Sequence, residues 1–381
     1  MEIQQILPEL VAIRHQLHSF PEIGLSEVET PELIARTLAS WGIEVERGLG
    51  KTGLVGQISR GSGTRSVGLR ADFDALAIVE ETGLPYASRR RGVMHACGHD
   101  GHVAMLLGAA WLLSQRSGLN GRINLIFQPA EENFGGAKLM IDDGLFDRFP
   151  CDRIFALHNL PGLEVGAFAT RKGAIAASAD VVKLTVRGKG GHGAMPEATV
   201  DPIIAGASIA MALQTLVSRG VEACDAAVLT IGSFHGGVSS TIIPDSAELL
   251  ISIRATRPDT RALLCSRVEQ IATMQAASFG ADVKFEWDLG YPATVNDDKS
   301  VELVRQTITA RSGSPAFRFL DEPKMFSEDF SFMLEKVPGA YVLVGNGDSS
   351  ALHTSTYDFN DACIGHGGTY LADIAALSLS S

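Results

Sequence analysis

Two short stretches hold the side chains of this chain that are best suited to chemistry, the run CGHDGH at 97–102 and the run PAEE at 129–132. A thiolate and a neutral imidazole two positions apart, as at Cys97 and His99, suit zinc, and imidazole with carboxylate also accepts manganese or cobalt. Of the two adjacent glutamates, one can bind a metal ion while its neighbour accepts a proton from water. Either stretch alone has a plainer explanation, since Cys-x-His occurs by chance and paired glutamates suit the first turn of a helix. Together they predict a hydrolase that depends on a divalent metal.

Further candidate ligands come directly after predicted strands. The strands are expected over 67–70, 123–127 and 154–157, and the polar residues that follow them are Asp72, Asp74, Glu131, Glu132 and His158. The strands at 123–127 and 154–157 are short and apolar, which is typical of strands that are covered on both faces. Binding sites in open α/β sheets lie at the carboxyl ends of strands. We therefore expect these side chains to meet in one crevice.

Helices alternate with these strands and predict an α/β fold with a mostly parallel central sheet flanked by helices. The helices are expected over 1–20, 30–41, 102–115, 301–311 and 362–377, and further strands over 53–58 and 341–344. The second helix is expected to begin near Thr30, which can cap it, and Pro31, which suits its first turn, and to end at Gly42.

The middle of the chain has a different pattern. Strands are expected at 181–186, 227–231, 247–253 and 283–287, and helices at 202–217 and 260–278. Polar residues such as Lys183 and Thr185 alternate with apolar ones, so one sheet face is expected to be solvated or to form an interface. We interpret 177–292 as an inserted second domain of α+β type. The catalytic domain would then be discontinuous, over 1–176 and 293–381.

The composition is that of a globular protein large enough for two domains, with 381 residues of which 45% are hydrophobic. A net charge of −12 argues against nucleic acid or an anionic membrane as a partner. The longest apolar stretches, such as 103–113 and 203–213, are too short to span a bilayer. The first residues have neither a basic leader nor an apolar core, and five cysteines are thinly spread. We therefore expect reduced thiols and a cytoplasmic location.

Three familiar motifs are incomplete in this sequence. The run GKT at 50–52 ends like a phosphate-binding loop, but Val45 stands where that loop needs glycine. The glycine-rich run at 188–193 does not open directly onto a helix, as a dinucleotide-binding loop would. No Gly-x-Ser-x-Gly pattern occurs, which argues against a serine hydrolase.

Eight runs of residues follow one another in a recognisable order. They are RADFDAL at 70–76, TGLP at 82–85, MHACGHDGH at 94–102, QPAEE at 128–132, HN at 158–159, GHGA at 191–194, SEDF at 327–330 and LH at 352–353. This series resembles the M20 metallopeptidase and aminoacylase group. It is most similar to the branch that contains hippurate hydrolases, N-acyl-amino-acid amidohydrolases and indole-acetyl-amino-acid hydrolases. The resemblance extends over essentially the whole chain.

The resemblance implies an enzyme that hydrolyses the amide bond of an N-acyl amino acid, acetyl or aroyl, to a carboxylic acid and a free amino acid. A dipeptidase or an N-acetyl-diaminopimelate deacetylase would use the same chemistry and differ only in the substrate pocket. A third alternative is a binding protein that keeps the fold without the metals. Against it, every expected ligand is present.

The resemblance also implies two divalent metal ions per subunit, of manganese, zinc, cobalt or nickel. Their implied ligands are Cys97, which would bridge the ions, His99, Glu132, His158 and His353. Glu131 would be the general base. Asp72 and Asp74 would orient ligands through hydrogen bonds, and His95 and His102 are further candidates for such contacts.

A last group of implied residues lies in the inserted domain, which by the same resemblance is expected to be a ferredoxin-like lid and dimerisation domain. The resemblance implies that His192 reaches the active site of a partner subunit and stabilises the developing oxyanion, so a homodimer, or a tetramer, is expected. Arg254, at the end of a predicted strand, could bind a substrate carboxylate bidentately. Relatives often have asparagine where Thr241 stands, and Thr241 is therefore a candidate substrate contact that cannot supply an amide donor.

Overall fold

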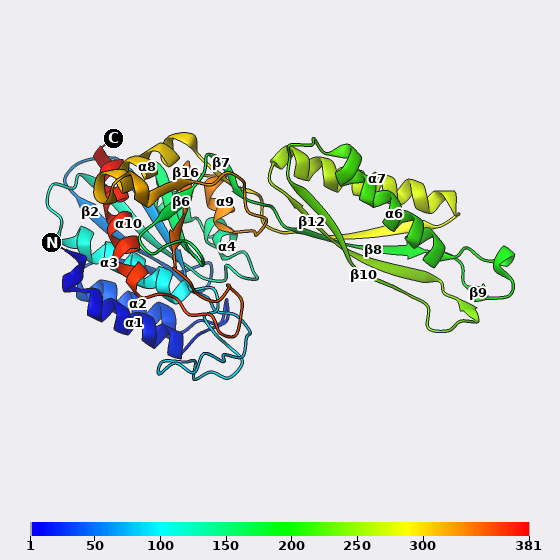
Figure 1. The fold of residues 1–381 in the computed structure, drawn as a ribbon, viewed down its shortest axis with the longest axis horizontal. Helices are drawn as coiled ribbons and strands as arrows, with labels where there is room; N and C mark the ends of the chain where they lie inside the picture. The colour runs from blue at the N-terminus through cyan, green and yellow to red at the C-terminus, as the bar shows by residue number, and fades with distance from the viewer. Residues whose placement is uncertain (1, 381) are drawn as a thin grey trace. The chain divides into compact units, whose positions relative to one another are not determined.

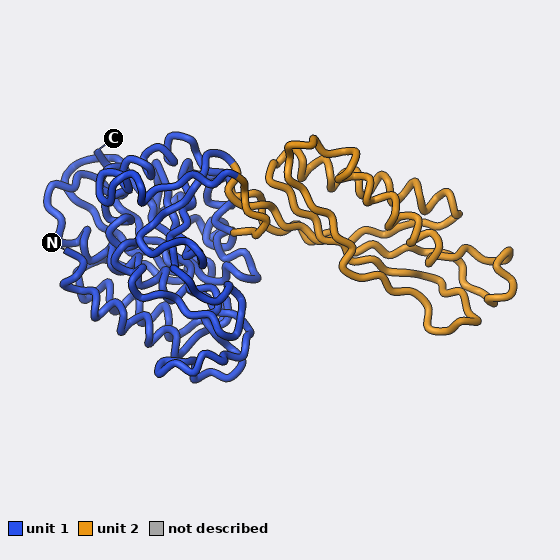
Figure 2. Tube along the Cα trace, in the orientation of Figure 1, with its two compact units in different colours: residues 1–173, 295–321, 329–381 blue, residues 174–294, 322–328 orange. Residues whose placement is uncertain are grey.

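The computed structural model describes residues 2–380, which form two compact units (Figure 2). Unit 1 contains 1–173, 295–321 and 329–381, and unit 2 contains 174–294 and 322–328. The chain leaves unit 1 after Gly173 and returns to it at Val295, whereas the sequence placed these limits at 176 and 293. The short segment 322–328 is an addition to unit 2 that the sequence does not predict.

Unit 1 is built around an eight-stranded sheet (Figure 1). In spatial order its strands are β1 (Glu44–Leu49), β2 (Gly53–Arg60), β4 (Gly121–Gln128), β3 (Ser66–Asp72), β5 (Arg153–Leu160), β16 (Gly339–Gly345), β6 (Phe168–Thr170) and β15 (Phe317–Phe319). The four central strands, from β4 to β16, run parallel, and β2 and β6 lie antiparallel to the strands next to them in this group. β3 and β16 are buried along their whole length, as expected for parallel strands that are covered on both faces.

The register of this sheet brings the candidate residues to one edge. Asp72 ends β3 and is paired with Gln128, which ends β4, so the residues that follow both strands leave the sheet side by side. β5 pairs with β16 as far as Leu160, and His158 therefore lies inside the strand. The expectation that His158 follows its strand was wrong, because the backbone ladder continues beyond the apolar run that ends at Leu157.

Eight α-helices among the described residues belong to unit 1. They are α1 (Leu7–Ser19), α2 (Glu29–Ser40), α3 (His99–Gln115), α4 (Gly136–Asp142), α5 (Leu145–Arg148), α8 (Asp298–Ser312), α9 (Phe330–Leu334) and α10 (Ala362–Ser380). α3 and α10 share one core with the β3 side chains of Val67 and Leu69. Their approach is close, since a Cβ at Gly367 of α10 would lie 2.0 Å from Sδ of Met105 in α3. The helix expected over 1–20 is in fact a short 3₁₀ turn, Ile3–Gln5, followed by α1.

Unit 2 has the order β8 (Asp180–Arg187), α6 (Pro202–Gly220), β10 (Ala227–Gly236), β12 (Ser246–Ala255), α7 (Pro258–Ser278) and β13 (Asp282–Leu289). Its four strands form an antiparallel sheet in the spatial order β10, β12, β8, β13. This βαββαβ connectivity is that of a ferredoxin-like domain. The alternation of polar and apolar residues explains why these segments form strands. In β12, for example, every second residue from Ala247 to Ala255 is buried.

The helix α6 begins where Asp201 caps it, accepting hydrogen bonds from the backbone N–H groups of Ile203 and Ile204. Among the described residues it is the one helix that is long and apolar enough, by length and composition, to cross a membrane. A single helix of this kind is weak evidence for a membrane span. Ile209 and Leu213 of α6 are buried in the core of unit 2, which gives part of its apolar character a structural explanation.

Two further two-stranded sheets are short. One pairs β9 (Gly191–His192) with β11 (Ile242–Ile243) in unit 2, and the other pairs β14 (Thr294–Asn296) with β7 (Gly173–Ala176).

Candidate metal centre

Five side chains that could ligate a metal converge at the edge of the unit 1 sheet, around the thiol of Cys97. Its Sγ lies 3.4 Å from Nε2 of His158 and 3.3 Å from Nε2 of His353. Oε1 of Glu132 lies 3.3 Å from Nε2 of His353 and 3.8 Å from Nε2 of His99. The segments that carry them are far apart in the chain, from the start of α3 to the loop that precedes α10.

These donors form two groups that share one atom. The candidate ligand atoms of Cys97, His99 and His158 lie within 4.8 Å of one another, and so do those of Cys97, Glu132 and His353. The thiol of Cys97 belongs to both groups. This arrangement is suited to two ions that share a sulfur ligand.

The polar atoms of the cluster are not satisfied by the protein alone. Nε2 of His99 and Oε1 of Glu132 are buried and have no hydrogen-bond partner among residues 2–380. Burial, and then the charges of Glu132 and Glu131, raise the pKa of the Cys97 thiol well above its ordinary value. A divalent cation would satisfy both orphaned atoms and stabilise the thiolate, and the mixed nitrogen, sulfur and oxygen donors suit zinc and its neighbours in the periodic table. The residues present therefore fit a divalent metal centre.

The turn into α3 explains how Cys97 and His99 come together. Gly98, between them, has a φ of 91° in the left-handed region. A Cβ at this position would lie 2.5 Å from Oδ1 of Asn159 and 2.8 Å from the hydroxyl of Tyr357. Only glycine fits both the backbone conformation and the space, so the CGH sequence is required for the geometry as well as for the ligands.

Hydrogen bonds to the backbone fix the orientation of two imidazoles. Nδ1 of His99 lies 2.9 Å from the carbonyl oxygen of Asp74, and Nδ1 of His158 lies 2.8 Å from the carbonyl oxygen of Asn159. A carbonyl oxygen only accepts, so in both rings Nδ1 carries the proton that it donates. Nε2 is then the nitrogen of each ring that faces the cluster, as it must be in a metal ligand.

The two aspartates that were expected to orient ligands have different hydrogen-bond partners. Oδ1 of Asp74 lies 3.2 Å from Nδ1 of His99, and Oδ2 of Asp74 accepts the backbone N–H of Glu132 at 3.0 Å. Asp72 accepts from Nδ1 of His102 at 2.5 Å. Asp72 thus contacts His102 through Oδ1, while its Oδ2 lies 3.8 Å from Nε2 of His99. By contrast, neither ring nitrogen of His95 has a hydrogen-bond partner within the described part of the chain.

The pKa values of His158 and His99 are shifted in opposite directions. Burial lowers the pKa of His158 well below its ordinary value, and the neighbouring His102 lowers it further, so His158 is neutral. Burial would also lower the pKa of His99, but the carboxylates of Asp72, Asp74 and Glu132 outweigh it and raise the pKa to about 10. A cation that binds His99 must displace this proton, so metal binding here releases protons.

Arg70 is a buried residue of the site to which the sequence assigned no role. Its guanidinium donates to Asp72 at 2.7 Å, to Oε1 of Gln128 at 2.8 Å and to Oδ1 of Asp329 at 3.0 Å. The backbone N–H of Asp329 in turn donates to Oε1 of Glu131 at 3.4 Å. The signal for this network is present in the sequence, since all these residues lie in the recognised runs, but only the fold shows that they meet.

The remaining candidates belong to unit 2. His192 in β9 is exposed, and its Nδ1 accepts the backbone N–H of Ala194 at 3.0 Å, so in the neutral ring Nε2 carries the proton and is a donor. Thr241 is close by, because its carbonyl oxygen accepts the N–H of Gly193 at 2.8 Å. Arg254 instead lies near the other end of β12, where Nη1 donates to the carbonyl oxygen of Met325 at 2.9 Å. Unit 2 therefore brings His192 and Thr241 together and keeps Arg254 apart from them.

Comparison with known proteins agrees with this geometry. The model of peptidase family M20/M25/M40 matches residues 68–376. A hippurate hydrolase of Campylobacter jejuni is 42% identical over 375 residues, which cover 98% of this chain and 97% of the relative. An N-acetyl-L-cysteine deacetylase of Bacillus subtilis is 36% identical and covers 98% of this chain and 89% of its own. A solved structure from Bacillus subtilis, described as a dinuclear metal-binding peptidase of family M20, superposes with a TM-score of 0.88 at 32% identity, over 99% of both chains.

Proposed function

The chain belongs to peptidase family M20/M25/M40, and we propose that it is a metal-dependent amidohydrolase that cleaves the amide bond of N-acyl amino acids. The products would be a carboxylic acid and a free amino acid. The observation that carries the proposal is the pair of donor groups that share the thiol of Cys97. The hydrolase and deacetylase relatives support the choice of an N-acyl amino acid as substrate.

The proposed metal ligands are the five side chains of the cluster. Cys97 would bridge two divalent ions, and the others are His99, Glu132, His158 and His353. The ions would supply a Lewis acid that polarises the amide carbonyl and lowers the pKa of the attacking water. Manganese, zinc, cobalt and nickel all suit this donor set.

Glu131 would act as general base. Its carboxylate is buried and lies beside the donor groups, with its candidate ligand atom within 4.8 Å of those of His99 and Glu132. From this position it would accept the proton of the attacking water and transfer it to the departing nitrogen. The hydrogen bond from the Asp329 N–H would hold the carboxylate in place between these steps.

Substrate contacts are proposed for three residues of unit 2. Arg254 would bind the carboxylate of the amino-acid part, Nε2–H of His192 would donate to the developing oxyanion, and Thr241 would lie beside the substrate next to His192. Thr241 precedes β12 and Arg254 lies near its end, so the length of this strand places roughly 25 Å between them. A small substrate that contacts both His192 and Arg254 must therefore receive them from two different subunits.

This argument requires a homodimer, and the surface of unit 2 supports one. β10 is an edge strand of the sheet, and an unpaired edge is suited to strand pairing between subunits. Apolar side chains are exposed on the adjoining elements, with Ile204 and Met211 on α6 and Val238 in the loop after β10. A cytoplasmic location is part of the proposal as well, because a thiolate ligand is best kept reduced there.

A panel of substrates tests the proposed activity. Purified enzyme reconstituted separately with Mn²⁺, Zn²⁺, Co²⁺ and Ni²⁺ is assayed for amine release from N-benzoylglycine, N-acetyl amino acids, dipeptides and N-acetyl-diaminopimelate. We expect kcat/KM for an N-acyl amino acid to exceed that for dipeptides by about tenfold or more. Faster cleavage of dipeptides or of N-acetyl-diaminopimelate would favour those activities instead. Protein that binds none of these metals and releases no amine would be a binding protein.

A further inference from the structure

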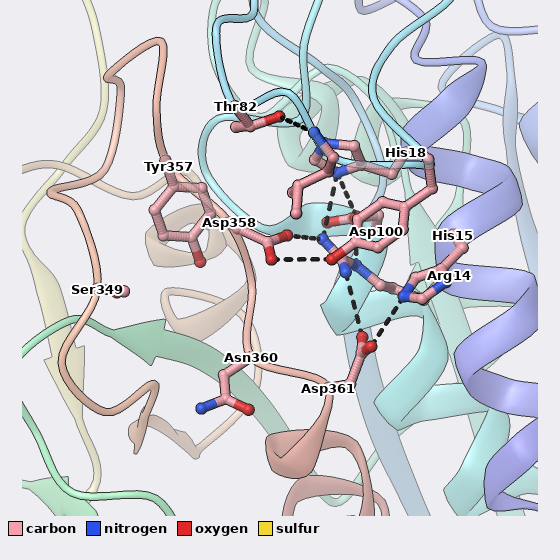
Figure 3. Close-up of polar contacts among 12 residues, drawn as sticks. Arg14, His15, His18, Thr82, Asp100, Ser349, Tyr357, Asp358, Asn360 and Asp361 are labelled. Carbon is pink, nitrogen blue, oxygen red and sulfur yellow. Dashed lines mark hydrogen bonds and ion pairs between the residues drawn. The ribbon is translucent and has the colours of Figure 1, made fainter.

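Arg14 of α1 is a fully buried cation that is surrounded by three aspartates (Figure 3). Nε donates to Oδ2 of Asp100 at 2.8 Å, Nη2 to Oδ1 of Asp358 at 2.5 Å and Nη1 to Oδ1 of Asp361 at 3.1 Å. A buried guanidinium without such partners would be strongly destabilising. The buried guanidinium of Arg14 therefore fixes the positions of the three carboxylates.

These aspartates lie on the two segments that carry outlying ligands of the candidate metal centre. Asp100 directly follows His99 in the first turn of α3. Asp358 and Asp361 follow His353 in the segment between β16 and α10. One side chain of α1 thus connects a segment near residue 100 to a segment near residue 358.

The segment that carries His353 needs an external restraint. His353 has a φ of 61°, which is unfavourable for a residue with a Cβ, and half of its side chain is exposed. Its backbone N–H donates to the carbonyl oxygen of Ala96 at 2.8 Å, which holds one side of the segment. On the other side, Asp358 is bound by Arg14 and by the hydroxyl of Tyr86, at 2.9 Å from Oδ2.

The contacts of Asp100 complete the network. Its Oδ2 is shared between Arg14 and Nδ1 of His18, which lies 2.8 Å away. Asp361 is likewise shared, because Nε2 of His15 lies 2.8 Å from its Oδ2. Both histidines are on α1, so this helix holds the two ligand segments through three of its side chains.

We propose that Arg14 is a positioning residue of the metal centre, which acts on His99 through Asp100 and on His353 through Asp358 and Asp361. The inference rests on the proposed function in one respect, since it takes His99 and His353 to be metal ligands. The residues that position a ligand typically affect metal affinity tenfold to a hundredfold. A purely structural role would instead lower the stability of unit 1 and leave the metal centre of the folded protein unchanged.

The informative variant is Asp358→Asn, because Asp358 is one-third exposed and its loss leaves the buried Arg14–Asp100 pair intact. Arg14→Lys is the stronger variant, since lysine cannot contact three carboxylates in this fork geometry. Asp373→Asn is the matched control. Asp373 is also an aspartate of unit 1 bound by arginines, Arg116 and Arg311, but it lies in α10 and contacts no ligand segment.

The measurement is the rate at which metal passes from the purified holoenzyme to a chelator, with the absorption spectrum of the Co²⁺-substituted protein, kcat, KM and the free energy of unfolding. We expect Asp358→Asn to release metal about tenfold faster than wild type with an altered Co²⁺ spectrum, and Arg14→Lys to release it faster still. Asp373→Asn should match wild type. Wild-type release rates and spectra in Asp358→Asn and in correctly folded Arg14→Lys would overturn the inference, as would an equal acceleration in Asp373→Asn. Wild-type protein that binds no metal would overturn the proposed function itself. Wild-type protein that binds two ions, held equally well by the variants, would overturn only the role of Arg14.

Discussion

Glu131 and Glu132 are adjacent in the chain, yet their carboxylates have different partners. Oε1 of Glu131 accepts the backbone N–H of Asp329 at 3.4 Å, whereas Oε1 of Glu132 lies 3.3 Å from Nε2 of His353. The left-handed backbone of Ala130, with a φ of 54°, precedes the pair at the end of β4. This turn gives the two neighbouring side chains different partners, which suits the separate roles of base and ligand proposed for them.

The variant Glu131→Gln tests the proposed base. Glutamine keeps the shape and can still accept the Asp329 N–H, but it cannot take up a proton. We expect kcat to fall by about 10²–10⁴ while two metal ions per subunit are retained. Elemental analysis together with steady-state kinetics checks both parts. A wild-type kcat would show that another residue is the base.

The number of metal ions bound per subunit tests whether the two donor groups share the thiol of Cys97. Cys97→Ala removes a donor from both groups, so we expect it to lose both ions, whereas His353→Ala removes a donor from one group and should retain about one ion. Elemental analysis after gel filtration gives the metal content. Cys151→Ala is the control, since Cys151 lies outside both donor groups and should keep the wild-type content. Two retained ions in Cys97→Ala would exclude a bridging thiolate.

Mixing two inactive variants tests whether His192 acts in a partner subunit. His192→Ala and Glu131→Gln homodimers should each be nearly inactive. After dissociation and random reassociation, half of the dimers are mixed and one of their two sites has both residues, so about a quarter of wild-type activity should return. If His192 acts within its own subunit, no site in the mixed dimer is complete and no activity returns.

The substrate contact proposed for Arg254 predicts that replacing this residue changes KM. Arg254→Met should raise KM for an N-acyl amino acid about 10- to 100-fold, the loss expected for hydrogen bonds to a charged group. The corresponding amino-acid amide, which lacks the carboxylate, should be hydrolysed equally by variant and wild type. Arg257→Met removes a nearby exposed arginine and serves as control. An equal loss on both substrates would contradict a carboxylate contact.

Glu27 makes stability depend on pH. Its carboxyl group is buried, accepts the hydroxyl of Thr52 at 2.8 Å, and burial raises its pKa from 4.5 to about 7. Between these values the unfolded chain has lost a proton that the folded chain keeps, so stability falls as pH rises from about 4.5 to 7. Glu27→Gln should therefore be more stable than wild type at pH 8, by about 1–3 kcal/mol, and equally stable below pH 4.5. Urea unfolding of the metal-free proteins checks this, with the exposed Glu44→Gln as control, and a constant difference across the pH range would contradict it.

The sequence predicts the long elements well because their patterns are local. The buried runs of β3, β5 and β16 and the alternation of β12 contain the information in a few adjacent residues. β1 was missed because Glu44, Glu46 and Arg47 make it look like a loop. Only its pairing with β2 makes it a strand.

The site was predictable to the extent that its residues lie in compact runs. The runs around Cys97 and Glu131 indicate metal chemistry directly. The position of His158 within β5 instead depends on pairing with β16, and the residues around His158 do not predict that pairing. Arg14 could not be predicted at all. A lone arginine on an amphipathic helix is typical of a solvated side chain. The three aspartates that bind Arg14 are 86, 344 and 347 positions away in the chain.

The distance along the chain between Cys97 and His353, 256 positions, sets an order of events during synthesis. A ribosome completes the strands β3, β4 and β5 and then the whole of unit 2 before it adds β16 and the segment with His353. Until then the group formed by Cys97, Glu132 and His353 lacks one donor, and the sheet lacks the strand that pairs with β5. The nascent chain therefore carries an incomplete, thiol-containing donor group until the segment with His353 has emerged.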